Sequence, residues 1–115
     1  MEVSNVSVGV VGLGLMGCSI TTCLLMAGHR VVAIAPLPID IPTAHPRIHD
    51  HLQKSQEEGL VNEHPDYFFK NLMITEDYNA LSDCELVIEC TLESLPIKKS
   101  VYEKIEAVIS TKAVI

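Results

Sequence analysis

The chain contains no tryptophan, few aromatic residues and few basic side chains. Aromatic residues make up 4% of its 115 residues, and 8 Lys and Arg stand against 15 Asp and Glu, a formal net charge of −7 at pH 7. Nucleic acids and anionic membrane surfaces bind basic faces of proteins. The charge balance therefore argues against nucleic acid and against a membrane surface as partners.

Long apolar runs and C-x-x-C cysteine pairs are also absent. Glycines at positions 9, 12, 14 and 17 interrupt the first apolar segment, so neither a signal peptide nor a transmembrane helix is predicted there. The cysteines lie in segments that are expected to form strands or helices. Reduced, buried thiols of a cytoplasmic protein are the expectation for all of them, namely Cys18, Cys23, Cys84 and Cys90.

The first third of the chain predicts a strand, a turn, a helix and a second strand. Residues 6–11 are mainly valine and end at glycines, as buried parallel strands often do. Residues 15–27 have helical spacing, and Gly28 is expected to end the helix. Residues 31–35 are again apolar and are followed by prolines, so they predict the second strand.

The middle of the chain is more polar, and its prolines at positions 36, 38, 42 and 46 predict an extended or turning connection. A helix is then expected over residues 48–58, and Asn62 is expected to cap a short helix ending near Phe69. The remaining predicted elements are strands at 72–75 and 86–90, a turn or a single helical turn at 77–81, and a helix from Pro96 to Ile109.

Alternating strands and helices predict an α/β fold with a Rossmann-like doubly wound parallel sheet, covered on both faces. Residues 113–115 resemble the start of a fifth strand. Chain ends are ordinarily polar and exposed. We therefore expect residues 1–115 to be one domain, a fragment truncated before the later strands. The exposed strand remnant also favours self-association into a homo-oligomer.

A glycine-rich turn, Gly12-Leu13-Gly14-Leu15-Met16-Gly17, connects the first strand to the first helix. A lone G-x-G-x-x-G is a weak signal, but this one has the strand before it and the helix after it that a dinucleotide site requires. The glycines allow a tight turn, close approach of a pyrophosphate and close helix packing. We predict a nicotinamide or flavin cofactor here; the alternative is a tight turn without a ligand.

The end of the second strand lacks the acid that usually binds the adenosine ribose of NAD. Ala35 occupies the expected position, and no arginine follows that would suit NADP. Asp40 is a possible substitute, but the prolines around it argue against that role. If the pocket is otherwise intact, Ala35→Asp is expected to tighten binding by about 1–3 kcal/mol. The alternative is a degenerate module, kept for structure or interaction, that binds little or no NAD.

The segment Asp83-Cys84-Glu85-Leu86-Val87-Ile88-Glu89-Cys90-Thr91-Leu92-Glu93 resembles the D-x-x-L-V-I-E-x-x-x-E segment of 3-hydroxyacyl-CoA dehydrogenases. The G-x-G-x-M-G form of the glycine turn is similar to theirs, but 3-hydroxyisobutyrate and 6-phosphogluconate dehydrogenases share it. An NAD(P)-binding domain of the 3-hydroxyisobutyrate or 6-phosphogluconate dehydrogenase type is therefore a further alternative. Likeness to the hydroxyacyl-CoA family continues through Ile97-Lys98-Lys99-Ser100-Val101-Tyr102 and spans nearly the whole chain.

The resemblance implies an NAD-dependent oxidoreductase of fatty-acid metabolism that oxidises the 3-hydroxyl of an acyl-CoA. It implies that residues 12–17 hold the pyrophosphate, that Ala35 occupies the ribose position, and that Glu93 and Lys98 lie near the nicotinamide. The family's catalytic His–Glu pair and its C-terminal helical domain for substrate and dimer contacts lie beyond residue 115. No catalytic residue is therefore expected here, and acyl-CoA is expected to bind only to a full-length protein.

No metal site is expected either. His45, His49 and His51 are close in sequence, but Pro46 is expected to place His45 at or before the start of a helix, which spoils the geometry for zinc. His29 is expected at the surface.

Overall fold

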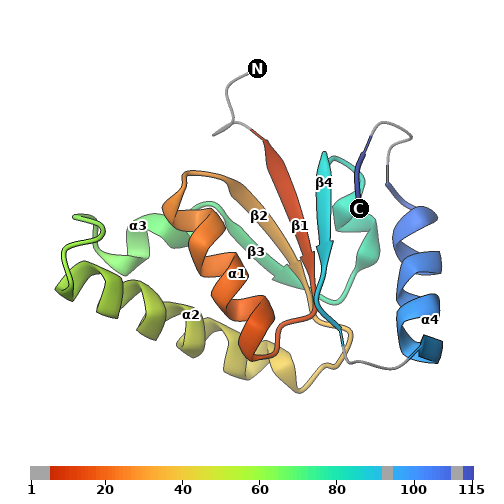
Figure 1. Ribbon diagram of the computed structural model, residues 1–115, viewed down its shortest axis with the longest axis horizontal. Helices are drawn as coiled ribbons and strands as arrows, with labels where there is room; N and C mark the ends of the chain where they lie inside the picture. Colours follow the sequence, from red (N-terminus) through yellow and green to blue (C-terminus); the bar gives the residue numbers. More distant parts are fainter. Residues whose placement is uncertain (1–5, 92–94, 110–112) are drawn as a thin grey trace.

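The structure, a computed structural model, describes residues 6–91, 95–109 and 113–115. Its strands and helices alternate along the chain, as predicted (Figure 1). The strands are β1 (Ser7–Val11), β2 (Arg30–Ile34), β3 (Leu72–Thr75) and β4 (Leu86–Glu89). The helices are α1 (Leu15–Met26), α2 (Asp40–Glu57), α3 (Pro65–Phe69) and α4 (Leu95–Glu106), with a 3-10 turn, η2 (Tyr78–Leu81).

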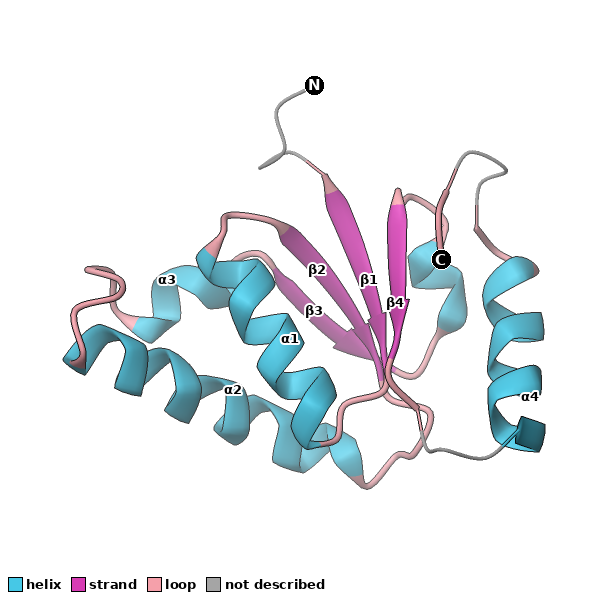
Figure 2. Ribbon diagram, viewed as in Figure 1, coloured by secondary structure: helices cyan, strands magenta, loops and turns pink. Residues whose placement is uncertain are grey.

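All four strands pair in parallel, in the order β3-β2-β1-β4 (Figure 2). The predicted α/β fold and parallel sheet are therefore confirmed. Val114 forms a parallel bridge with Leu86 of β4, where the Val87 N–H donates to the Val114 carbonyl at 2.7 Å. The expected start of a further strand thus lies beside β4, on the side away from β1.

The sheet separates two apolar cores, because successive side chains of a strand point to opposite faces. Val10 and Ala33 belong to one core, which α1, α2 and α3 cover. Their neighbours Val11 and Ile34 belong to the other core, with Val101 and further residues of η2 and α4. Every described strand that pairs on both sides is therefore buried on both faces, which explains the nearly continuous apolar runs.

Helix α2 is longer than the prolines led us to expect. It begins at Asp40, so Pro42 lies in the first turn, where a backbone N–H has no partner within the helix. Pro46 lies inside the helix, which continues past it. Ala44, Ile48 and Leu52 are buried on one face of α2. The prediction of an extended connection through residue 46 was wrong, because burial of this face outweighs the hydrogen bond that Pro46 cannot make.

The histidines of α2 also differ from the prediction. His45 lies within the helix, and its ring stacks on Phe69 of α3 with centroids 4.1 Å apart. His49, one turn later, has its ring centroid 6.3 Å from that of Phe69. In the described part of the chain, no three His, Cys, Asp or Glu side chains are placed to hold a metal ion. The histidines instead attach α2 to α3.

Three smaller predictions were wrong. His64, not Asn62, caps α3, by accepting a hydrogen bond from the Asp66 N–H. His29 is only 9% exposed, and its Nδ1 lies 3.3 Å from the Val6 carbonyl oxygen. Cys23 is exposed although Cys18 and Cys84 are buried; all the cysteines are free thiols. None of the helices in the described ranges combines the length and apolar character needed to cross a bilayer.

Candidate nucleotide-binding site

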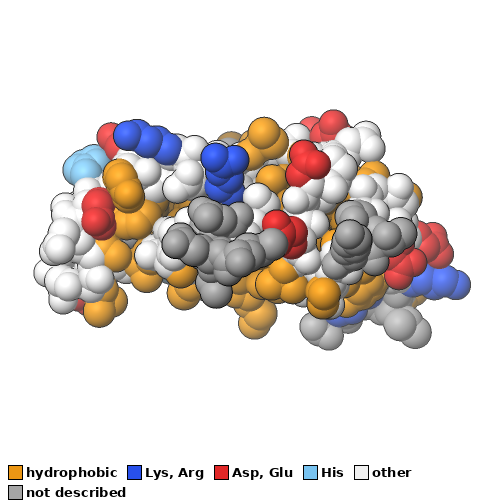
Figure 3. Space-filling view, turned by 90° about the horizontal axis from the view of Figure 1, so that it is seen from above, with side chains coloured by type: hydrophobic (Ala, Val, Ile, Leu, Met, Phe, Trp, Pro, Cys, Tyr) orange, Lys and Arg blue, Asp and Glu red, His pale blue; other side chains and the backbone are white. Residues whose placement is uncertain are grey.

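A cavity of about 430 Å³ lies at the carboxyl ends of the strands. Gly12 and Gly14 of the turn after β1 form part of its wall, and Pro36 and Leu37 follow β2. These loops meet the start of α4 at one end of the sheet (Figure 2). Open parallel sheets place ligands at this edge, where the strand order reverses. The opposite side of the molecule, at the amino ends of the strands, shows acidic and basic side chains among hydrophobic ones (Figure 3).

The first and last glycines of the turn are required by packing. Gly12 has φ +109°, and a Cβ there would lie 2.6 Å from the Cys90 carbonyl oxygen. A Cβ on Gly17 would lie 1.8 Å from the Gly12 carbonyl oxygen. These distances are shorter than any real contact, so α1 can cross this close to the turn only if both residues are glycine.

Gly14 has no such requirement within the protein. Its φ of −73° is open to any residue, and a Cβ there would have no atom of the described residues within 4 Å. Gly14 is the N-cap of α1 and faces the cavity. Because the first amides of a helix have no partner within it, they offer N–H groups and a partial positive charge to an anion. The open space above Gly14 therefore fits a phosphate group.

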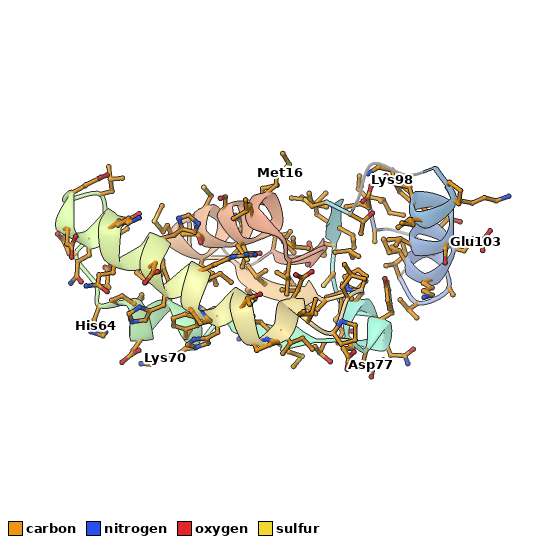
Figure 4. The ribbon with its side chains drawn as sticks, turned by 90° about the horizontal axis from the view of Figure 1, so that it is seen from below. Met16, His64, Lys70, Asp77, Lys98 and Glu103 are labelled. Carbon is orange, nitrogen blue, oxygen red and sulfur yellow. The ribbon has the colours of Figure 1, made fainter. Side chains whose placement is uncertain are left out.

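The side chains of the turn diverge from the cavity. Leu13 lines the wall, and the residue is fully buried in the core. Leu15 and Met16 are exposed, and Met16 points away from the sheet at the first turn of α1 (Figure 4). Leu15 and Met16 are absent from the wall of the cavity.

Ala35, the residue that follows β2, has no access to the cavity. Ala35 is 1% exposed and belongs to the core cluster that also contains Ala44 of α2. It is absent from the wall of the cavity, and its N–H donates to the Thr75 carbonyl at 3.0 Å. By contrast, Asp40 lines the cavity, because α2 starts there instead of farther along the chain.

Lys98 is held by a buried carboxylate at the end of β4, that of Glu89. Its Nζ donates to Oε1 of Glu89 at 2.8 Å, and the Glu89 side chain is 4% exposed. Oε2 of Glu89 accepts from the N–H and the hydroxyl of Thr91. Lys98 thus ties the start of α4 to the end of β4 (Figure 4). Glu93, the other residue predicted near the nicotinamide, lies outside the described residues.

These contacts determine the titration of Glu89. Burial on its own raises the pKa of the Glu89 carboxyl. The hydrogen bonds from Lys98 and Thr91 lower it by more than burial raises it, so the net pKa is below the ordinary 4.5. A carboxylate with a lowered pKa in the folded state adds stability above its unfolded pKa. That stability is lost as the pH falls through the folded value.

Glu89→Gln is therefore expected to cost about 1–3 kcal/mol of unfolding free energy at pH 7, as expected for a lost charged hydrogen bond. The deficit should begin to shrink as the pH falls below about 4.3, the ordinary pKa of glutamate in an unfolded chain, and should be lost once the pH has fallen through the lower pKa of the folded state. Urea unfolding at pH 7 and at a pH below that folded value measures this. Glu103→Gln is the matched control, since Glu103 is exposed on α4 and points outward (Figure 4). Equal deficits at the two pH values would contradict the assignment.

Two further polar residues of the cavity were missed from the sequence. Tyr78 of η2 lines the cavity, and burial raises the pKa of its phenol. Lys104 of α4 also lines it, with Nζ 5.5 Å from the centroid of the Tyr78 ring. No motif in the sequence indicates either residue, because their proximity depends on how η2 and α4 pack on the same face of the sheet.

The family model described as "3-hydroxyacyl-CoA dehydrogenase, NAD binding domain" matches residues 7–115. The chain belongs to this family. The match decides against the 3-hydroxyisobutyrate and 6-phosphogluconate dehydrogenase alternative and identifies NAD as the cofactor of the domain. It covers the glycine turn, the cavity and all described strands and helices.

Individual relatives agree. A 3-hydroxybutyryl-CoA dehydrogenase of Mycobacterium tuberculosis is 34% identical over 104 residues, which cover 90% of this chain and 36% of the relative. The human peroxisomal bifunctional enzyme is 32% identical over 107 residues, 93% of this chain and 15% of that protein. The crystal structure of M. tuberculosis FadB2 superimposes with a TM-score of 0.86 at 34% identity, covering 93% of this chain and 38% of that one. The chain thus spans a minor part of the length of these relatives.

Proposed function

We propose that this chain binds NAD(H) in the cavity at the carboxyl edge of the sheet and serves as the cofactor module of a 3-hydroxyacyl-CoA dehydrogenase. The observation that carries the proposal is Gly14, which faces the cavity at the N-terminus of α1 and which no contact with the described part of the chain requires to be glycine. Bound NAD⁺ supplies a hydride acceptor. In a longer protein, the hydride donor would be the 3-hydroxyl carbon of an acyl-CoA, the substrate class that the relatives' names indicate.

The residues divide into distinct roles in this proposal. The backbone from Gly12 to Gly17 holds the pyrophosphate, and Gly12 and Gly17 also allow the turn to pack. Lys98 donates to the nicotinamide half of the cofactor from its position on Glu89. Ala35 serves packing and makes no contact with the ribose. Catalysis is assigned to residues outside this chain.

Gly14→Ala tests the proposal directly. The methyl group meets no atom of the described residues, so the unfolding free energy should change by no more than about 1 kcal/mol, the typical size of an N-cap substitution. The same methyl group would occupy the approach of the pyrophosphate and weaken NADH binding by about ten- to a hundredfold, the equivalent of 1–3 kcal/mol of overpacking. Calorimetric titration with NADH and thermal melting measure the two effects.

Failure of the parent chain to bind NADH at millimolar concentration would reject the proposal and favour the degenerate module, kept for structure or interaction. Normal NADH affinity in Gly14→Ala would place the cofactor elsewhere.

We also propose a cytoplasmic location and self-association. Free thiols throughout suit a reducing compartment. Several relatives carry the word "peroxisomal" in their names, so the peroxisome is the alternative location. Val114 and Ile115 are exposed beside β4 and offer an edge for a second copy. Size-exclusion chromatography across a hundredfold range of concentration is expected to show a dimer or larger species; a monomer throughout would reject self-association.

A further inference from the structure

Asp40 is a half-buried carboxylate on the wall of the cavity. Among the described residues it forms no hydrogen bond through its side chain and no ion pair. Burial is the main reason why the pKa of the nearby Cys18 thiol is raised; Arg47 opposes the rise, and the charge of Asp40 adds to it. Cys18 itself donates to the Leu13 carbonyl within the glycine turn, at 3.4 Å. Asp40 therefore stands beside the turn, on the side of the cavity where β2 ends.

Tyr78 presents a second polar group without a partner. Its hydroxyl oxygen is fully buried and, within the part of the chain that the structure describes, makes no hydrogen bond. Buried hydroxyls of native proteins almost always have a partner, and one that lacks a partner indicates a missing ligand or water. Tyr78 lines the same cavity as Asp40, and the ammonium of Lys104 covers its ring.

The surroundings of these two groups are apolar. Pro36 and Leu37 precede Asp40, whose N–H donates to the Leu37 carbonyl. Ile97 and Val101 of α4 also line the cavity, and Tyr78 packs against the cluster that contains Val101. An apolar slot with a few fixed polar groups suits a flat heterocycle joined to a sugar. Asp40 lines the slot on the side where β2 ends, and Cys90 and Thr91, which follow Glu89, line it on the side of β4.

We propose that Asp40 and Tyr78 are the specificity-determining residues of the adenosine half of this site. The Asp40 carboxylate accepts hydrogen bonds from the ribose hydroxyls, taking over the task that Ala35 cannot perform, and the Tyr78 hydroxyl bonds to the polar edge of the adenine. This inference rests on the proposed function, since it names the residues that select the ligand of the same cavity. An anionic Asp40 also repels a 2′-phosphate and so selects NAD(H) over NADP(H).

The test compares ligands that differ only at the ribose. Parent chain is expected to bind NADH at least tenfold more tightly than NADPH, and ADP several-fold more tightly than 2′-deoxy-ADP, as measured by calorimetry. Asp40→Asn should lower NADH affinity by about tenfold, the size of one charged hydrogen bond, and should bring each pair of ligands within about twofold of one another. Asp50→Asn, which changes an exposed residue of the same helix, is the control.

Tyr78→Phe tests the second residue by separating affinity from stability. Phenylalanine fills the same space and removes an unpaired buried hydroxyl, so the melting temperature should stay equal or rise. NADH and ADP affinities should nevertheless fall by about three- to tenfold, the size of one neutral hydrogen bond. Tyr102→Phe, at a partly exposed residue of α4, should change neither quantity.

Each result has a separate meaning. A parent chain that binds neither NADH nor ADP overturns the inference together with the proposed function. A parent that binds NADH, with Asp40→Asn retaining its preference for ribose over 2′-deoxyribose, overturns the assignment of Asp40 and leaves the proposed function standing. Unchanged affinity in Tyr78→Phe overturns the assignment of Tyr78 in the same way.

Discussion

Gly17→Ala is expected to unfold this domain or to lower its melting temperature by roughly 10–20 °C. The new methyl group would lie 1.8 Å from the Gly12 carbonyl oxygen and 2.7 Å from its carbon, and both atoms are backbone, which cannot rotate away. Relief requires α1 to move off the sheet, where Cys18 and Leu25 are buried. Overpacking of this severity costs about 3 kcal/mol or more, a large part of the stability of a small domain.

The contrast with Gly14→Ala makes this prediction specific. Both changes add one methyl group to the same turn, yet one meets backbone and the other meets open space. Circular dichroism melts of the two variants and the parent, purified in parallel, give the comparison. Similar melting temperatures for all three would show that α1 is not held against the turn as the structure indicates.

Ala35→Asp is expected to destabilise the domain by about 3 kcal/mol at pH 7 and not to tighten NADH binding. This reverses the expectation drawn from sequence. Ala35 is 1% exposed and packs in the cluster that contains Ala44, so the carboxylate would enter an apolar core. Burial without a partner costs a polar group about 1–3 kcal/mol and a charged one more.

The deficit of Ala35→Asp should depend on pH. Burial raises the pKa of a carboxyl, so the introduced group would have a folded pKa above its unfolded value of about 3.9. The deficit is complete above the folded pKa and shrinks as the pH falls through it. Ala35→Asn, similar in shape but without charge, should show a constant deficit. An Ala35→Asp variant that is as stable as the parent and binds NADH more tightly would mean that the position opens toward the cofactor.

The sheet and the glycine turn were predictable because their signals are local. Continuous apolar runs predict buried strands, and β3 has the bounds expected from residues 72–75. Helix α2 was not predictable to its true start. Proline predicts the end of a helix because it has no backbone N–H to donate. The burial of Ala44, Ile48 and Leu52, which stabilises α2, depends instead on how the helix packs on α1 and the sheet.

In the candidate site, too, residues with a local sequence signal were predictable and residues brought in by tertiary packing were not. Gly12 and Gly14 were identified from spacing, because one short turn brings them together. Asp40 was set aside on account of the prolines, and the true course of α2 brings it to the cavity. Glu89 left a weak signal, a carboxylate in an otherwise apolar strand. Tyr78 left none, since its role depends on distant elements that meet only in the folded chain.

The three glycines of the turn have different reasons to be glycine, and this bears on the history of the chain. Gly12 and Gly17 are demanded by folding alone. A side chain at Gly14 meets open space among the described residues, so mutational drift would be free to replace it in a lineage that had abandoned its ligand. Gly14 is therefore the residue at which retention or loss of the cofactor would be recorded in descendants of this domain, while its two neighbours in the motif would persist in either case.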